Sequence, residues 1–240
     1  MKLDKITTQP FLKTKPLKCS YIEGNYEERL LFPIKSNNDL TVIEKLTQLG
    51  FRRNINYMYL PVCKGCSKCI STRILIDGFK ISKSQKRNLK KNGIIKFTTM
   101  IPNRQEERFD LFRRYLSFRH SDGIMLNMTK LDFYNFFYET PAKSRVYDIV
   151  SESDKIVGSI LLDEMTDAMS AVYSFYEPEL LSNGLGIFLI LKSLEEAKRI
   201  NKKYLYLGYW VKESKKMNYK ILFDNLQLFI DGNWISINKP

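Results

Sequence analysis

Three of the four cysteines in this 240-residue chain stand within seven residues of one another, and they could hold a metal ion or cluster. They are Cys63, Cys66 and Cys69, while Cys19 stands far upstream. Cysteines at C-x-x-C spacing can reach one ion from a tight turn, and a tetrahedral site would need Cys19 as its fourth ligand. The spacing therefore predicts a zinc or iron–sulfur site.

Lys64 and Lys68 stand between these cysteines and should favour thiolates, because a nearby positive charge lowers the pKa of a thiol. Thiolates bind zinc and iron–sulfur clusters, and they are also reactive on their own. The alternative is a reduced, partly buried cysteine turn that holds no metal. The sequence leaves both open.

A second group of chemically suited residues is cationic. Ser82 and Gln85 form a capping-box pattern and Gly93 provides a stop, which predicts a helix between them. The cations that this helix carries, most of them on one face, are Lys83, Lys86, Arg87, Lys90 and Lys91. Because no acidic residue occurs between Ile81 and Met100, we expect this face to bind nucleic-acid phosphates, the alternative being a solvated charged face.

The composition also favours an acidic partner. The chain has 39 lysines and arginines against 26 aspartates and glutamates, a formal net charge of +13, which attracts nucleic acids at long range. Hydrophobic residues make up 44%, enough for a folded core. No stretch is as long and apolar as a signal-peptide core or a membrane helix, so we expect a cytoplasmic protein with reduced thiols and no membrane partner.

Hydrophobic spacing predicts the elements that position these residues in the first half of the chain. A helix is expected from residue 40 to a stop at Gly50, and short strands over 57–62 and 72–76 should flank the cysteine run. A longer helix is expected over 105–119, and a shorter one should follow Thr129, whose hydroxyl can cap it.

The second half changes to a strand-rich pattern. Runs over 145–150, 155–163 and 168–176 are joined by short polar loops and predict an antiparallel meander. A helix opened by Asn183-Gly-Leu-Gly186 should follow, and then a strand over 204–211.

This order of elements, with its glycine turn, resembles the coenzyme-A-dependent N-acetyltransferases of the GNAT fold. There a glycine turn holds a pyrophosphate at a helix N-terminus, but the basic residue expected at its first position is missing here. We therefore expect an α+β chain. A GNAT-like carboxyl-terminal domain (antiparallel meander, glycine-opened helix, strand) should cover 101–240, and a smaller cysteine-containing α/β domain should cover 1–100.

His120 is the only histidine, so proton transfer by an imidazole near neutral pH would depend on it. It stands beside Arg119 and close to Asp122 in a predicted tight turn. The alternative is that its hydrogen bonds only stabilise that turn. Serine-centred elbows, Walker loops and His-x-x-x-His motifs do not occur. Hydrolase and kinase chemistry therefore have no support.

Taken together, an ordered series of motifs resembles the aminoacyl-tRNA–protein transferases. In the first half the matching segments are Cys19-Ser-Tyr, Gly50-Phe-Arg-Arg, the run from Tyr59 to Cys69, Arg73-Ile74, Ser84-Gln-Lys-Arg87-Asn88 and Asn92. In the second half they are Tyr115-Leu, Arg119-His-Ser-Asp-Gly123, Ser170 to Tyr176 with Pro178, Tyr206-Leu-Gly-Tyr-Trp210 and Lys216-Met-Asn-Tyr-Lys220. The compact length and the last two motifs are similar to the bacterial aspartate/glutamate leucyltransferase branch.

The resemblance implies transfer of leucine from leucyl-tRNA to proteins that begin with Asp or Glu, which marks them for degradation by an N-degron pathway. It implies a GNAT-like fold used without acetyl-CoA, so no cofactor is required. In eukaryotic relatives the amino-terminal cysteines are associated with an iron–sulfur cluster, but the arrangement here differs. Arginyl transfer by the same fold, N-acetyl transfer, and a non-enzymatic RNA-binding zinc knuckle are the alternatives.

The resemblance also suggests which residues act. Near the reacting ester we expect Tyr173, Tyr209 and Lys216, with His120 or Asp122 as proton acceptor. An acidic amino terminus needs a cationic pocket, for which Arg73 and Arg119 are the candidates because both lie in family-like motifs.

Overall fold

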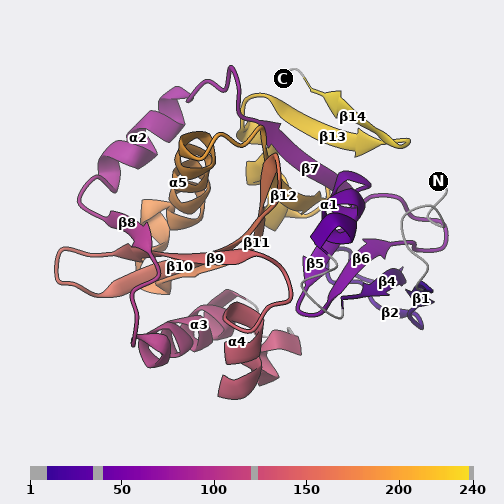
Figure 1. Cartoon of the computed structure of the whole chain (residues 1–240), viewed down its shortest axis with the longest axis horizontal. Coiled ribbons are helices and arrows are strands. Elements are labelled where there is room, and N and C mark those ends of the chain that lie inside the picture. Colours follow the sequence, from indigo (N-terminus) through magenta and orange to yellow (C-terminus); the bar gives the residue numbers. More distant parts are fainter. Residues whose placement is uncertain (1–9, 35–39, 120–123, 238–240) are drawn as a thin grey trace.

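The computed structural model describes residues 10–34, 40–119 and 124–237, and its first part forms a small antiparallel sheet (Figure 1). In spatial order its strands are β1 (Leu12–Lys13), β4 (Arg29–Pro33), β6 (Tyr57–Pro61) and β5 (Arg52–Asn54). The helix α1 (Leu40–Gln48) buries Ile43 and Leu46 in the same core as Phe32 and Met58 of this sheet. A separate ribbon pairs β2 (Leu17–Lys18) with β3 (Tyr26–Glu27).

A larger, eight-stranded sheet forms the centre of the second part of the molecule. In spatial order its strands are β14 (Asn233–Ser236), β13 (Leu226–Ile230), β7 (Ile70–Leu75), β12 (Tyr204–Trp210), β11 (Ala168–Tyr176), β10 (Ile156–Glu164), β9 (Ser144–Val150) and β8 (Lys96–Thr99). Neighbouring strands are antiparallel except β11 and β12, which are parallel. The expected meander is confirmed as β9, β10 and β11.

Helices cover both faces of this sheet. Figure 1 shows α2 (Lys83–Lys91) and α5 (Leu185–Arg199) on one side of β9 and β10, and α3 (Gln105–Arg119) and α4 (Lys130–Phe137) on the other. The described residues also contain short 3-10 helices: η3 (Ile124–Asn127), η4 (Pro178–Asn183) and η5 (Lys215–Leu222). The crossover through α5 makes β11 and β12 parallel, because a single crossover helix returns the chain in the same direction. Within the described residues, no helix is long and apolar enough to cross a membrane.

The expected domain boundary at residue 100 falls inside the large sheet. Strand β7 lies between β12 and β13, and β8 forms the edge beside β9, although both precede residue 100. The physical reason is pairing between segments more than a hundred residues apart, which local sequence patterns do not encode. The small sheet ends before β7.

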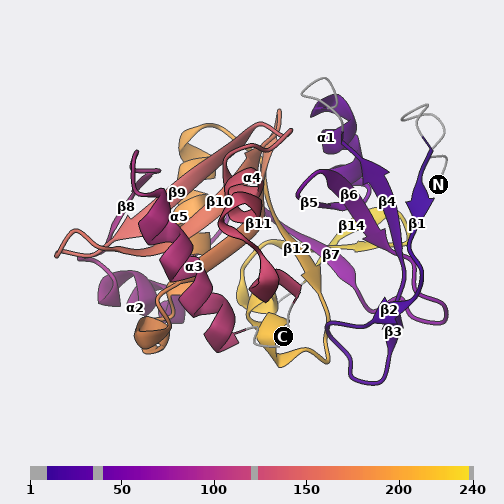
Figure 2. The same cartoon turned by 90° about the horizontal axis from the view of Figure 1, so that it is seen from below.

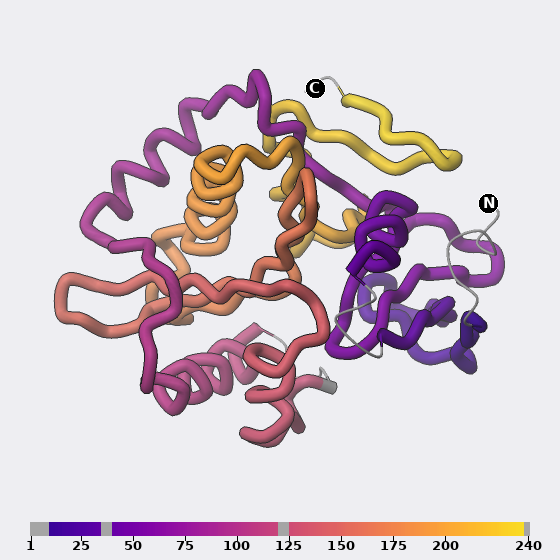
Figure 3. Tube along the Cα trace, viewed as in Figure 1, coloured from indigo at the N-terminus to yellow at the C-terminus, as the bar shows by residue number. Residues whose placement is uncertain are grey.

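Buried side chains fasten the small sheet to the large one. Arg53 of β5 forms a two-pronged ion pair with Asp163 of β10, at 2.5 and 2.8 Å. The indole of Trp234 in β14 donates to the carbonyl of Gln48 at 2.9 Å. Figure 3 shows this closeness between the yellow carboxyl-terminal hairpin and the indigo-to-purple first part of the chain. The small amino-terminal sheet is therefore fixed in place by the meander and by the carboxyl-terminal hairpin.

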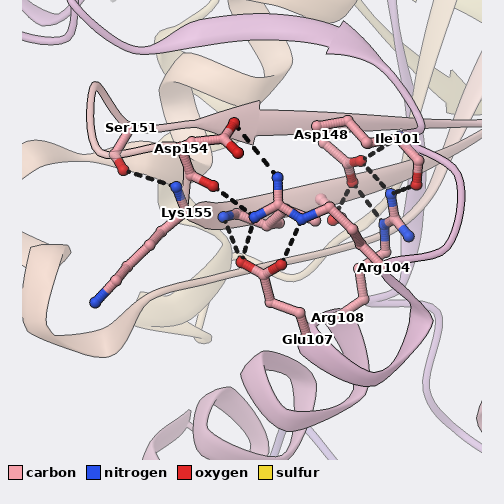
Figure 4. Close-up of polar contacts among 10 residues, drawn as sticks. Ile101, Arg104, Glu107, Arg108, Asp148, Ser151, Asp154 and Lys155 are labelled. Atoms are coloured by element: carbon pink, nitrogen blue, oxygen red, sulfur yellow. Dashed lines mark hydrogen bonds and ion pairs between the residues drawn. The ribbon is translucent and has the colours of Figure 1, made fainter.

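A second buried ion pair anchors α3 to the meander (Figure 4). Arg108 donates through Nε to Asp148 at 2.9 Å and through Nη2 to the other oxygen of the same carboxylate. Asp148 also accepts from Ser159 and from the backbone of Ile101, at 2.7 and 2.9 Å. Both charged side chains are fully buried, so the pair depends on these bonds.

Candidate functional site

The large sheet divides where β11 and β12 separate. They pair only over Ala168–Ser170 and Tyr204–Tyr206. Beyond that point β11 continues with β10 and β12 with β7, so the facing strand edges diverge toward their carboxyl ends. Backbone carbonyls on these edges need other partners.

The guanidinium of Arg52 occupies the point of divergence. It donates to the carbonyls of Ala171 and Val172 on β11, at 3.2 and 2.5 Å, and to that of Leu207 on β12 at 3.2 Å. Gly208 permits this approach, since its φ is +73° and a Cβ there would lie 1.3 Å from Nη1 of Arg52. The glycine of the Tyr-Leu-Gly-Tyr-Trp motif is therefore needed for Arg52 to bridge the strands.

Four tyrosines from three elements lie near one another beyond this point, namely Tyr115 of α3, Tyr173 and Tyr176 of β11, and Tyr219 of η5, and Tyr219 lies near Arg52. The rings of Tyr115 and Tyr176 meet edge to face, with centroids 5.0 Å apart. Arg52 and Tyr176 both act on Tyr219 electrostatically, and burial raises the pKa of Tyr219. The hydroxyl of Tyr219 is therefore protonated at neutral pH and can donate a hydrogen bond. We call Arg52 and the four tyrosines the divergence site.

Tyr173 has a free hydroxyl within this site. Its ring packs edge to face against Phe112 and Phe136, and its oxygen is buried without a hydrogen-bond partner in the described part of the chain. Burial raises the pKa of this hydroxyl. A buried hydroxyl without a partner costs about 1–3 kcal/mol, so it is suited to a group that arrives with a substrate.

Two lysines of η5 have different surroundings. Lys216 is exposed and donates to the carbonyl of Arg119 at 3.3 Å, which places it at the end of α3. Lys220 is buried and donates to the carbonyl of Tyr209. Burial, together with the charge of Arg52, holds the pKa of Lys220 well below its usual range. Sequence reasoning missed both Arg52 and Lys220, although both stand in motifs that carried the resemblance.

Tyr209 joins the two sheets. Its hydroxyl lies 3.0 Å from the carbonyl oxygen of Gly50 and 2.9 Å from that of Tyr59, and the residue is 2% exposed. A hydroxyl has one proton to donate, so these carbonyls share it. This places the predicted catalytic Tyr209 in a contact with the small sheet.

Arg73 lies in an aromatic cage on the large sheet. Its guanidinium carbon is 3.7 Å from the ring centroid of Tyr204 and 4.3 Å from that of Trp234. It donates to Gln227 at 2.7 Å and to the hydroxyl of Tyr206 at 3.1 Å. The side chain proposed for acidic amino termini is thus already surrounded by protein groups, whereas the backbone of Arg119 contacts η5. His120 and Asp122 lie outside the described residues.

The cations of α2 face solvent. Gln85 is buried, and Asn88 and Asn92 turn toward α5, which leaves the opposite face to the five predicted cations. All five are exposed, and within the described residues none forms an ion pair. The capping box of Ser82 with Gln85 is confirmed at 2.9 and 3.2 Å. The helix therefore presents uncompensated positive charge.

The glycine turn that opens α5 is covered by α2. Asn88 donates to the carbonyls of Asn183 and Gly184 at 2.9 and 3.1 Å, and Asn92 donates to that of Asn183 at 2.9 Å. A Cβ at Gly184 would lie 2.7 Å from the amide nitrogen of Asn88. Asparagine side chains of α2 thus pack directly on the turn that opens α5.

The four cysteines are free and partly buried. Burial, with the neighbouring thiols of Cys19, Cys63 and Cys66, raises the pKa of Cys69 to about 12. The expected lowering of thiol pKa by lysine is therefore wrong for Cys69.

Burial is the largest cause of this difference. Lys68 is exposed and pairs with Glu213 at 2.7 Å. Among residues 10–34, 40–119 and 124–237 no three histidine, cysteine or acidic side chains are arranged to hold a metal ion. A zinc or iron–sulfur site on the four cysteines stays a prediction, and we derive no chemical step through one.

The meander and the glycine-opened crossover define a GNAT-like fold. A conserved protein of unknown function from Bacteroides thetaiotaomicron has a similar structure, with a TM-score of 0.50 at 12% identity over 63% of this chain and 54% of that one. A GNAT-family acetyltransferase from Staphylococcus aureus Mu50 aligns with a TM-score of 0.40 at 14% identity, over 52% of this chain and 79% of that one.

Sequence comparison gives the family. Residues 17–87 match the amino-terminal part and residues 107–230 the carboxyl-terminal part of arginine-tRNA-protein transferase. The chain is 36% identical to the aspartate/glutamate leucyltransferase of Dinoroseobacter shibae, over 96% of this chain and 84% of that protein. It is 37% identical to that of Ruegeria pomeroyi, over 96% and 85%. The chain belongs to the arginine-tRNA–protein transferase family and is an aminoacyl-tRNA–protein transferase.

Proposed function

We propose that this enzyme transfers leucine from leucyl-tRNA to the amino-terminal Asp or Glu of acceptor proteins. The observation that carries the proposal is the 36% identity, across 96% of the chain, to a relative named aspartate/glutamate leucyltransferase. The product would have a destabilising amino terminus and enter degradation. Both substrates place the reaction in the cytoplasm.

The chemistry needs position more than a protein nucleophile, because the aminoacyl ester is already activated. The α-amino nitrogen attacks the ester carbonyl carbon and forms a C–N bond, while the C–O bond to the terminal ribose breaks. The amine gives up a proton and the ribose oxygen gains one. Holding the two substrates together contributes several kcal/mol, and hydrogen-bond donors must meet the carbonyl oxygen as it becomes negative.

We propose Tyr173 as such a donor, because its hydroxyl is buried, protonated and unpartnered within the described residues. Tyr173→Phe is expected to lower kcat about 10²-fold, as removal of one oxyanion donor does, with a small change in KM. The control is Tyr138→Phe, which removes a hydroxyl from the same aromatic cluster away from the divergence. An equal decrease of kcat in both variants would reject Tyr173 as the hydrogen-bond donor. Single-turnover transfer from radiolabelled leucyl-tRNA measures the step.

His120 and Asp122 stay the proposed proton acceptors, because they follow Arg119, whose backbone contacts Lys216. His120→Gln is expected to remove the acidic limb of the pH profile of kcat/KM, since an unperturbed imidazole titrates near pH ~6.5. If that limb is unchanged, Asp122 becomes the preferred acceptor. We propose a structural role for Tyr209, whose hydroxyl is already bonded to the small sheet.

N-acetyl transfer is disfavoured by the covered glycine turn. Asn88 and Asn92 occupy the carbonyl side of the turn, and α2 would have to move before a pyrophosphate could reach α5. Asn88 and Asn92 stand in the motifs that resemble the tRNA-dependent family, which supports tRNA as the acyl donor.

One experiment separates the candidates. The purified protein is incubated with a peptide that begins with Asp and, in separate reactions, with leucyl-tRNA, arginyl-tRNA or acetyl-CoA. Peptide mass then reports the added group. We expect a leucine adduct alone; an arginine adduct or an acetyl adduct would replace the proposal with the corresponding alternative.

A further inference from the structure

Two neighbouring arginines of β5 differ in how their charges are balanced. Arg53 pairs with the buried carboxylate of Asp163. Arg52 has no carboxylate partner in the described part of the chain, where it donates hydrogen bonds to three backbone carbonyls of β11 and β12. A partly buried charge is normally paired, so we expect a bound substrate to supply the negative charge that pairs with Arg52.

The groups around Arg52 are hydroxyls and cations. It acts electrostatically on Tyr21, Tyr59, Tyr219 and the buried Lys220, and none of these supplies a carboxylate. Its carbonyl bonds hold the guanidinium in place between the two strands. A guanidinium has five N–H donors, so three carbonyl contacts leave it able to donate further.

The position relates this charge to the reaction. Arg52 donates to the carbonyls of Ala171 and Val172, the two residues before Tyr173 on β11, so its guanidinium is held at the same divergence of strands that Tyr173 follows. An α-amine that reacts there carries its own side chain on the adjacent Cα, so the side-chain carboxylate of Asp or Glu must lie close to the reacting nitrogen. If that side chain is a carboxylate, Arg52 is positioned to be its counter-charge.

We infer that Arg52 recognises the acidic side chain of the acceptor's first residue and determines the preference for Asp and Glu. The inference rests on the proposed function and names a residue of that site that the motifs alone did not distinguish from Arg73 or Arg119. It also explains why Gly208 admits the guanidinium at the point where the strands part. A neutral side chain at the acceptor's amino terminus would leave this cation unbalanced.

The test compares Asp- and Asn-initiated peptides of otherwise identical sequence, with leucyl-tRNA as donor. In the wild-type chain the kcat/KM ratio of Asp to Asn is expected to exceed about 10, because a charged hydrogen bond to a buried partner is worth more than 1.4 kcal/mol. Arg52→Gln should bring the ratio close to 1, and Arg52→Lys should retain part of it. Arg113→Gln, an exposed arginine of α3, is the control and should keep the wild-type ratio.

Because both peptides meet the same protein sample, a loss of folded protein cancels from the ratio. If Arg52→Gln lowers kcat/KM equally for both peptides, Arg52 acts on the ester carbonyl oxygen or on the structure. If it raises only the KM for tRNA, Arg52 binds a phosphate. Either result overturns the inference. If the wild type transfers no leucine, the proposed function fails by itself. Calorimetric binding of the two peptides to the wild type and Arg52→Gln then decides the inference independently.

Discussion

Replacing Arg108 with methionine is expected to lower the free energy of unfolding by about 3–5 kcal/mol, the usual result of removing one partner from a buried ion pair. Asp148 would then be left fully buried with a charge that only Ser159 and the backbone of Ile101 still bind. The meander and α3 both contribute to the aromatic core that holds Tyr173, so the loss should appear as a lower urea midpoint with an unchanged slope.

Arg104, which immediately precedes α3, is the matched control. It pairs with Glu107 at 2.6 Å and lies near Asp154, but these groups are partly or largely exposed (Figure 4). Arg104→Met should therefore cost less than about 1 kcal/mol. Replacing Arg108 and Asp148 together by apolar residues should cost less than Arg108→Met alone. If Arg104→Met and Arg108→Met lower the free energy of unfolding by similar amounts, the buried pair is not what anchors α3.

Removing the charges of α2 is expected to weaken leucyl-tRNA binding about 10²-fold at physiological salt. The variant changes four exposed cations to glutamine: Lys83, Lys86, Arg87 and Lys90. Each phosphate contact contributes about 0.7–0.9 to the slope of log affinity against log salt, so the slope should fall by roughly 3. Filter binding across a salt series measures both quantities.

The location of α2 supports this large effect. Lys91 donates to η4 at 2.9 Å, Arg114 of α3 pairs with Glu177 beside η4 at 2.8 Å, and Lys216 of η5 contacts Arg119. Figure 2 shows α2 and the carboxyl-terminal end of α3 along the same lower edge of the molecule. An RNA held by α2 can thus extend along this edge toward the divergence site.

The control removes four positive charges that already have acidic partners, namely Lys130, Lys143, Lys192 and Arg199. Net charge changes equally, so a general long-range effect would weaken tRNA binding equally in both variants. We expect the control to keep most of the wild-type slope. An equal fall in the two slopes would show that α2 is not a local binding surface.

Local sequence patterns determined the elements of this protein. The predicted helix over 105–119 is α3 with the same bounds, and the capping boxes at Ser82 and Thr129 open α2 and α4 as expected. These features depend on residues three or four positions apart, whose spacing directly fixes a hydrogen bond or a buried face. The meander was predictable for the same reason, because its strands follow one another through short loops.

Tertiary structure alone decided which side chains meet. Strand β7 enters between β12 and β13, which puts Arg73 among Tyr204, Tyr206 and Trp234. In the motif Gly50-Phe-Arg-Arg the two arginines look alike, yet alternation along β5 sends Arg53 to Asp163 and Arg52 to the divergence of strands more than a hundred residues away. The sequence by itself determined the family, the local elements and the excess of positive charge. Which cation lacks a counter-charge depended on contacts between distant segments, since burial and pairing are properties of the folded chain.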